Sequence, residues 1–149
     1  MKVYLAGRFS RLPELVSYAD VLEANGVTVT SRWLRGGHEW VGTPDEEIPV
    51  DRLAQFAQDD IDDLMAADIV VCYTESPRSG PARGGRHVEF GYALAMEKRI
   101  LVVGHRENVF YCLPNVTFVE TTGDAIALVL ASQLDELMPW RKQRSAVTS

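Results

Sequence analysis

The sequence has no long apolar run and only two cysteines. No segment approaches the roughly 20 apolar residues that span a bilayer, and the N-terminal stretch Met-Lys-Val-Tyr-Leu-Ala-Gly is too short for the apolar part of a signal peptide. Cys72 and Cys112 sit among apolar residues and fit no metal-ligand spacing, so we expect buried thiols rather than a disulfide. These absences predict a soluble cytoplasmic protein with no metal and no other cofactor.

Positive charge is also scarce. The 149 residues include 15 Lys and Arg against 21 Asp and Glu, a formal net charge of -6, whereas a general nucleic-acid binder has a basic surface. Local positive pockets in an acidic protein favour a small anionic ligand over a nucleic-acid polymer or a membrane. Five arginines cluster near two expected loops: Arg8, Arg11, Arg78, Arg83 and Arg86.

Three common motifs are missing as well. Gly80-Pro-Ala-Arg-Gly-Gly lacks the Gly-Lys-Ser/Thr of a P-loop, and no Gly-x-Gly-x-x-Gly follows the first expected strand. His87-Val88-Glu89 matches the His-x-Glu of zinc deaminases, but the Pro-Cys-x-x-Cys that completes that site is absent. A P-loop NTPase, a dinucleotide dehydrogenase and a zinc deaminase are therefore disfavoured.

Apolar runs of strand length alternate with longer stretches of helical period. This alternation predicts one α/β domain over residues 1–140, with a parallel sheet and helices on both faces. The polar tail at 141–149 is expected to be disordered. The expected strands are 2–6, 27–33, 69–73, 99–104 and 116–119, and the expected helices are about 12–24, 50–65, 85–97 and 122–138.

Ligands of such sheets bind beyond the carboxyl ends of the strands. That edge collects residues 7–11, the loop at 74–84 and the loop after Gly104. The loop at 35–48 has no clean period, and loops of this length are often functional; its Trp40 is a candidate for stacking on a base. Tyr4, Phe9 and Trp33 could stack similarly, but aromatic side chains are more commonly part of the core.

Residues 83–97 join a Gly-rich loop bearing arginines to a helix that carries Glu89 in its expected first turn. A helix N-terminus favours an anion, so Glu89 would be held ionised there, as a carboxylate nucleophile must be, and the adjacent loop could cradle a phosphate. The alternative is that Glu89 only complements the helix dipole. Asp60, Asp63 and Asp68 lead toward the same edge, and one of them could act beside Glu89, although acidic residues on a helix are commonly a solvated face.

Three segments together resemble the nucleoside 2-deoxyribosyltransferase superfamily, which includes 2′-deoxynucleoside 5′-phosphate N-hydrolases and CMP N-glycosidases. They are Val3-Tyr-Leu-Ala-Gly7, residues 60–71 beginning Asp-Ile-Asp-Asp-Leu-Met, and Glu89-Phe-Gly-Tyr-Ala-Leu-Ala followed by Lys98-Arg-Ile-Leu-Val-Val. The resemblance runs from about residue 2 to 130. It implies a flavodoxin-like (Rossmann-like) domain with a five-stranded parallel sheet of order 2-1-3-4-5, and a homodimer or larger homo-oligomer.

The resemblance also implies roles for individual residues. Glu89 matches the nucleophile that attacks C1′ of the sugar, and Asp60 matches an Asp that positions substrate and assists departure of the base. An ionised carboxylate beside C1′ would stabilise the positive charge that builds on the sugar. The implied phosphate-binding residues are Gly7, Arg8, Ser10 and Arg11, and the neighbouring Phe9, Gly85 and His87 complete the expected substrate site.

The sequence departs from the family pattern just before Glu89. Transferases typically have an Asp and a Gly-Thr there, and the phosphate hydrolases a Ser with alternating Gly, whereas this chain has Arg83-Gly-Gly-Arg86-His87. Because guanidinium groups bind phosphate bidentately, the arginines favour an N-glycosidase acting on a (deoxy)nucleoside 5′-monophosphate. Base exchange between nucleosides and a non-catalytic nucleotide-binding protein are the alternatives.

Overall fold

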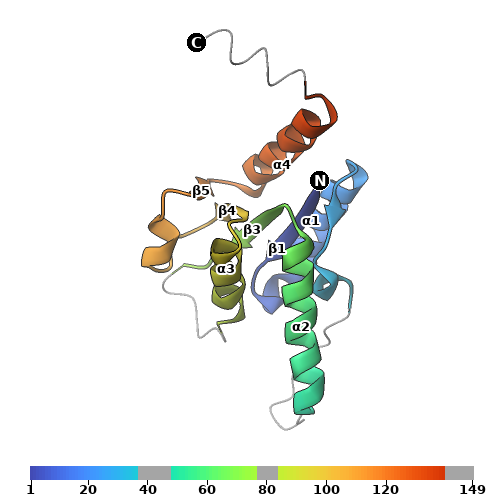
Figure 1. The fold of residues 1–149 in the computed structure, drawn as a ribbon, viewed down its shortest axis with the longest axis vertical. Coiled ribbons are helices and arrows are strands. Elements are labelled where there is room, and N and C mark those ends of the chain that lie inside the picture. The colour runs from blue at the N-terminus through green and yellow to red at the C-terminus, as the bar shows by residue number, and fades with distance from the viewer. Residues whose placement is uncertain (37–47, 77–83, 140–149) are drawn as a thin grey trace.

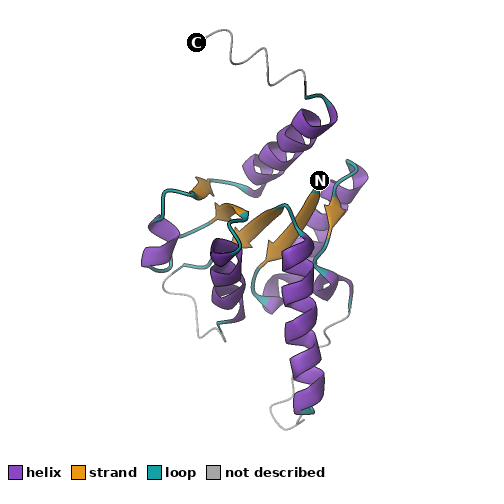
Figure 2. Cartoon of the chain, viewed as in Figure 1, coloured by secondary structure: helices purple, strands orange, loops and turns teal. Residues whose placement is uncertain are grey.

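A five-stranded parallel sheet organises the computed structural model, which describes residues 1–36, 48–76 and 84–139. The strand order is β2-β1-β3-β4-β5, and all four neighbouring pairs are parallel. This confirms the expected fold class and strand order. Figure 2 shows the strands with helices on either side. The strands are β1 (Lys2–Ala6), β2 (Thr28–Val29), β3 (Ile69–Tyr73), β4 (Arg99–Val103) and β5 (Val116–Val119).

Helices cover both faces of this sheet, as the alternating pattern predicts. Helices α2 (Val50–Ala66) and α3 (Gly85–Ala95) pack against each other and against β1, while α1 (Leu12–Ala24) and α4 (Thr122–Leu137) pack together on the other face (Figure 1). Three short 3-10 helices complete the connections: η1 (Phe9–Arg11), η2 (Arg32–Arg35) and η3 (Val109–Cys112).

The core lies between the sheet and these two helix layers. Every residue of β3 is buried, because a central parallel strand is covered on both faces. Helix α1 turns Leu15, Ala19 and Leu22 inward and ends at Asn25, before Gly26 at φ +80°. Among the described residues, no helix is both long and apolar enough to cross a membrane.

The second expected strand, at 27–33, is too long. Strand β2 covers only Thr28–Val29, and the chain turns into η2 by Arg32. The reason is tertiary, since Trp33 packs into the core and its indole nitrogen donates to the Leu5 carbonyl at 3.1 Å. The Ser31 hydroxyl also accepts from the Leu5 amide at 2.6 Å. Trp33 is thus a core residue rather than a surface for a base.

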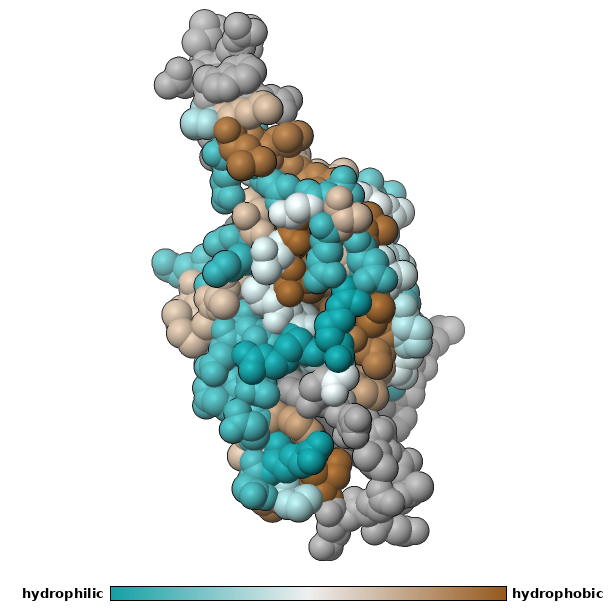
Figure 3. All heavy atoms as spheres, turned by 90° about the vertical axis from the view of Figure 1, so that its right-hand side faces the viewer, coloured by the Kyte–Doolittle hydropathy of each residue, from teal (hydrophilic) through white to brown (hydrophobic). Residues whose placement is uncertain are grey.

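The apolar stripe of α2 is largely exposed, although the apolar stripe of a helix ordinarily faces the core. Val50 is 82% exposed, Leu53 44% and Met65 47%. A helix of 17 residues is about 25 Å long, whereas a strand of five residues spans about 16 Å, so α2 extends past the sheet (Figure 1). Apolar surface is visible where α2 begins, at the lower end of the molecule (Figure 3).

The two cysteines differ in their surroundings. Cys72 is buried in β3, but Cys112 is exposed at the end of η3, so the expectation of two buried thiols is half wrong. Three further expectations concern Trp40, Arg83 and the tail at 141–149, which lie outside the described residues. Their predicted roles remain predictions.

Candidate active site

Three polar side chains from three elements meet on one face of the sheet. β1 contributes the fully buried Tyr4, α2 contributes Asp60, and α3 contributes Glu89. The Tyr4 hydroxyl donates a hydrogen bond to Oε1 of Glu89 at 2.5 Å and lies within hydrogen-bonding reach of Asp60. Because side chains alternate along a strand, Tyr4 points to the side that α2 and α3 cover. The two predicted catalytic carboxylates are therefore neighbours.

Burial makes both carboxyl groups resist ionisation. Removal from water, followed by the charge of Asp60, raises the pKa of Glu89 to about 7, although the Tyr4 hydrogen bond and Arg86 act in the opposite direction. Burial, followed by the charge of Asp63, likewise raises the pKa of Asp60 to about 7. Burial also raises the pKa of Tyr4 well above its usual value, so the phenol stays a neutral donor. Near neutral pH the pair holds about one proton.

The expectation that the helix N-terminus keeps Glu89 ionised is wrong. Helix α3 begins at Gly85 and has no acidic residue in its first turn, so Glu89 lies in the second turn. The influence of a helix dipole falls off within the first turn, and desolvation dominates instead. Glu89 therefore does not simply complement the dipole. It is a carboxyl group whose ionised form is disfavoured by burial.

Of the three acidic residues expected near Glu89, only Asp60 adjoins it. Asp63 is buried and accepts from the backbone amide and the guanidinium of Arg32, at 2.8 to 3.0 Å. Asp68 accepts from the Lys2 amide at 2.7 Å, at the start of the sheet. These two carboxylates have structural roles.

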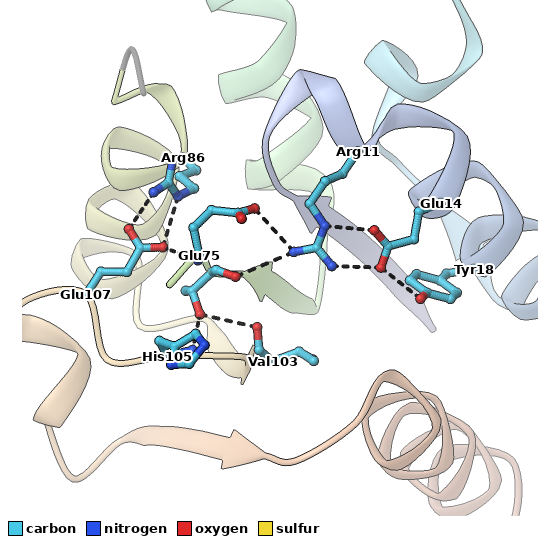
Figure 4. A network of polar contacts seen from close by, with 9 residues as sticks. Arg11, Glu14, Tyr18, Glu75, Arg86, Val103, His105 and Glu107 are labelled. Atoms are coloured by element: carbon cyan, nitrogen blue, oxygen red, sulfur yellow. Dashed lines mark hydrogen bonds and ion pairs between the residues drawn. The ribbon is translucent and has the colours of Figure 1, made fainter. Parts of the chain in front are cut away.

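Arg11, expected in a phosphate clamp, is bound to carboxylates (Figure 4). Its guanidinium makes two hydrogen bonds to Glu14, at 2.8 and 2.7 Å, and an ion pair with Glu75 at 3.4 Å. Glu14 in turn accepts from the Tyr18 hydroxyl at 2.9 Å. The charge of Arg11 is therefore largely neutralised by neighbouring side chains.

Arg86 is neutralised in a similar way, by a residue of the loop after β4. Glu107 accepts from its Nε at 3.2 Å and its Nη2 at 2.5 Å. The same carboxylate lies 3.2 Å from His87 Nε2 and accepts from the Glu75 amide at 2.5 Å. His87 Nδ1 also lies 3.2 Å from the Tyr111 hydroxyl, so its ring is held by η3 and by the loop after β4 rather than presented to Glu89.

The remaining predicted residues lie at the carboxyl end of β1 and the start of α3. Gly7 follows β1, and a Cβ there would meet Leu15 Cδ1 at 2.6 Å, so the close approach to α1 requires glycine. Ser10 and Phe9 are exposed in η1, while Arg8 is partly buried just before it. A Cβ on Gly85, in the first turn of α3, would meet no atom of the described residues within 4 Å.

No group of three or more His, Cys, Asp and Glu suited to a metal ion occurs among residues 1–36, 48–76 and 84–139. Asp60 adjoins two other protic groups, Tyr4 and Glu89. Such a set can move protons and attack an electrophilic carbon, which is acid–base and nucleophilic chemistry.

Two site residues escape prediction from the sequence. Tyr4 stands in an apolar strand, where a core role is expected, and no local signal separates it from Val3 or Leu5. Glu107 lies in the loop after β4, where charged residues are common. Only the packing of α3 against β1 and against the β4 loop reveals what each of them contacts.

Comparison with known proteins supports the fold. No protein-family model and no curated protein matches the chain. Among solved structures, a 2-deoxyribosyltransferase from Bacillus psychrosaccharolyticus is 16% identical, with a TM-score of 0.61, over 85% of this chain and 90% of that one. The CMP N-glycosidase of Clostridium botulinum is 19% identical, with a TM-score of 0.51, over 87% and 98%.

A conserved protein from Enterococcus faecalis V583 is 12% identical, with a TM-score of 0.58, over 85% of this chain and 95% of that chain. At these identities the likeness concerns architecture. The chain shares the fold of a 2-deoxyribosyltransferase and a CMP N-glycosidase across most of its length, which confirms the predicted resemblance at the level of fold.

Proposed function

We propose that this protein is an enzyme that cleaves the N-glycosidic bond of a (deoxy)nucleoside 5′-monophosphate. The observation that carries the proposal is the cluster of Glu89, Tyr4 and Asp60, two carboxyl groups of raised pKa that share one phenol. Perturbed titratable groups gathered in one place are the usual mark of acid–base and nucleophilic catalysis. The shared fold with two enzymes that are named for nucleoside and nucleotide glycosyl chemistry supports it.

The proposed reaction has two steps. First, a carboxylate oxygen of Glu89 forms a bond to C1′ while the C1′–N bond breaks, and the base leaves with that electron pair and takes up a proton. Water then attacks C1′, loses a proton and releases the Glu89 carboxylate, giving sugar 5-phosphate and free base. Retaining glycosidases divide their reaction in the same way.

Tyr4 and Asp60 have different proposed roles in these steps. The Tyr4 hydroxyl, donating to Oε1 at 2.5 Å, orients the Glu89 carboxylate and opposes the rise in its pKa. With a pKa of about 7, Asp60 holds its proton at neutral pH more readily than an ordinary aspartate, and it can donate that proton to the departing base.

The 5′-phosphate is proposed to bind beyond the carboxyl ends of β1 and β3. Support comes from the partly buried Arg8 and the exposed Ser10 beside β1, and from Gly85 where α3 begins, since a Cβ there would meet no atom of the described residues within 4 Å. Backbone amides at a helix start are suited to a phosphate group. Arg83 remains a predicted contributor outside the described residues.

Base exchange between unphosphorylated nucleosides is a second candidate, and a specific observation favours it. Arg11 and Arg86 already bind Glu14 and Glu107, so their attraction for a phosphate is weaker than that of free guanidinium groups. In this reaction a second base, rather than water, would attack C1′ of the glycosyl-enzyme.

A panel of ribo- and deoxyribonucleosides and their 5′-monophosphates, with release of free base resolved by chromatography, tests these alternatives. Base release from a monophosphate supports the proposal. Formation of a new nucleoside when a second base is added supports exchange. Binding that survives Glu89→Ala, with no turnover by the parent protein, would identify a non-catalytic nucleotide-binding protein.

We also propose that the protein forms a homodimer through α2 and α3. The evidence is a row of solvent-exposed apolar side chains on α3 and its C-cap. Val88, Tyr92 and Met96 are 60%, 40% and 46% exposed, and they recur every four residues along one side of the helix. The exposed stripe of α2 lies on the same face of the sheet. Light scattering coupled to gel filtration should give twice the chain mass of 16.6 kDa.

A further inference from the structure

We infer that Glu107 is the positioning residue that holds helix α3 in the orientation in which Glu89 meets Tyr4. The inference rests on the proposed function for its catalytic consequence, and on the contacts of Glu107 for its structural part. Glu107 lies in the loop after β4 and its side chain is only 10% exposed. Its hydrogen bonds go to Arg86 and to the Glu75 amide, so its effect on catalysis passes through other residues.

The first turn of α3 needs an external anchor. Its N-cap residue is Gly84, in the left-handed region at φ 86°, and a glycine has no side chain with which to cap the helix. A helix start leaves backbone N–H groups without intrahelical partners and frays readily. Glu107 supplies the anchor, because its carboxylate holds the side chains of Arg86 and His87, the second and third residues of α3.

The same carboxylate ties this turn to the neighbouring loops. One oxygen accepts from the Glu75 amide, just after β3, as well as from Arg86 Nε. Next to Glu75, the Thr74 hydroxyl accepts from the His105 amide at 2.6 Å and donates to the Val103 carbonyl at 3.2 Å (Figure 4). These hydrogen bonds join the ends of β3 and β4, and Glu107 connects Arg86 to them.

The geometry of a helix links Arg86 to Glu89. Arg86 and Glu89 are three residues apart, so their side chains lie on adjacent parts of the helix surface. On the adjoining side, Phe90 stacks on Tyr111 at 4.1 Å between ring centroids. Without Glu107, the packing of α3 on α2, on the sheet and on Tyr111 remains, but its first turn loses the tie to the loops after β3 and β4 and can shift. A displacement of about 1 Å at a reacting group can cost about 100-fold in rate.

The test compares Glu107→Gln and Glu107→Ala with Glu120→Gln, which changes an exposed glutamate just after β5. We expect kcat for base release to fall about tenfold in Glu107→Gln and about 100-fold in Glu107→Ala. KM for a 5′-monophosphate should rise as well, because the first turn of α3 is also the proposed phosphate site, whereas KM for the corresponding nucleoside should change less than about threefold. Glu120→Gln should match the parent. Unchanged kcat in Glu107→Ala would overturn the inference.

A second measurement is independent of activity. Amide hydrogen exchange at Val88, Glu89 and Phe90 should accelerate about tenfold or more in Glu107→Ala, because local opening of α3 becomes easier, while α4 amides should be unaffected. Unchanged exchange in α3 overturns the inference. If the parent protein releases no base from any substrate, the proposed function fails, and the exchange rates alone decide whether Glu107 positions the helix.

Discussion

The Tyr4 hydroxyl lies 2.5 Å from Oε1 of Glu89, and it joins the middle of β1 to the second turn of α3 across 85 positions of sequence. Tyr4 is a neutral donor, and its hydrogen bond lowers the pKa of Glu89, whereas burial raises that pKa and favours the protonated carboxyl group. The pKa of Glu89 therefore reflects a balance in which desolvation is opposed by this hydrogen bond. Removing either contribution should change the pH range in which Glu89 is ionised.

Tyr4→Phe removes the hydroxyl and keeps the ring. Because the hydrogen bond from Tyr4 lowers the pKa of Glu89, the acid limb of the pH–rate profile should move to higher pH in this variant. Loss of the contact that orients the attacking oxygen should also lower kcat, by up to about 100-fold, because a displaced reacting group attacks poorly. Tyr92→Phe, the same change at a 40% exposed position of α3, is the matched control. A Tyr4→Phe enzyme with a parental pH profile would contradict the role given to this contact.

The pH–rate profile should be bell-shaped. The rate rises as Glu89 ionises and falls as Asp60 loses the proton that it gives to the base, and both have pKa values of about 7. The two limbs report the pair rather than single residues. In Asp60→Asn the alkaline limb should vanish, and the acid limb should move to lower pH because a charge that raises the pKa of Glu89 is gone. Initial rates from about pH 5 to 9 measure both shifts, and an alkaline limb that persists in Asp60→Asn would exclude this residue as the acid.

Stability should fall as pH rises, since both groups have folded pKa values of about 7 and ordinary values of 4.5 and 3.8. From about pH 4 to 7 the folded protein holds protons that the unfolded chain has lost, so the free energy of unfolding decreases with pH. The loss should be about 3 kcal/mol at most for Glu89, and less than its pKa shift alone implies for the more exposed Asp60, because solvent screens its charge. Urea unfolding at about pH 5 and about pH 8, on either side of the folded pKa values, measures it.

Glu89→Gln offers the matched comparison for this stability effect. The amide cannot ionise, so the variant should lose less stability than the parent between the two pH values, while base release falls by more than about 1000-fold. Equal pH dependence in the two proteins would mean that Glu89 ionises without cost in the folded state.

Gly104→Ala should destabilise the protein, including the hydrogen bonds of Thr74 that join the ends of β3 and β4. Gly104 has φ +124°, and a Cβ there would lie 2.6 Å from Thr74 Oγ1 and 2.9 Å from the Thr74 carbonyl oxygen. Strain and the close contact together should lower the free energy of unfolding by roughly 2–4 kcal/mol. Gly123→Ala, whose nearest contact would be at an ordinary 3.5 Å, is the control, and equal urea midpoints would contradict the argument.

The phosphate preference can be tested at Arg8. If the substrate is a 5′-monophosphate, Arg8→Gln should raise KM for it about tenfold or more, because charge-assisted bonds to phosphate are among the stronger polar contacts, and should leave kcat nearly unchanged. The control is the corresponding nucleoside, whose KM should not respond. Equal effects on nucleoside and nucleotide would indicate that Arg8 does not bind the phosphate.

The sequence by itself determined the layout of the fold. Alternating buried strands and amphipathic helices leave a doubly covered parallel sheet as the expected arrangement, and the strand order that the resemblance implies is the observed one. The local pattern also pointed to Glu89, and the resemblance selected Asp60 among three acidic residues. These features depend on periodicity and on short motifs, which are local properties of the chain.

Tertiary structure decided the chemistry of the site. The sequence pattern places Glu89 at a helix start that would keep it ionised, but its charge state depends on burial between α3, α2 and β1, and so does the part played by Tyr4. In the sequence the arginines resemble a free phosphate clamp, whereas in the fold Glu14 and Glu107 bind Arg11 and Arg86. Desolvation depends on residues far apart in the chain, and so does the pairing of Arg86 with Glu107, so no local pattern could have supplied them.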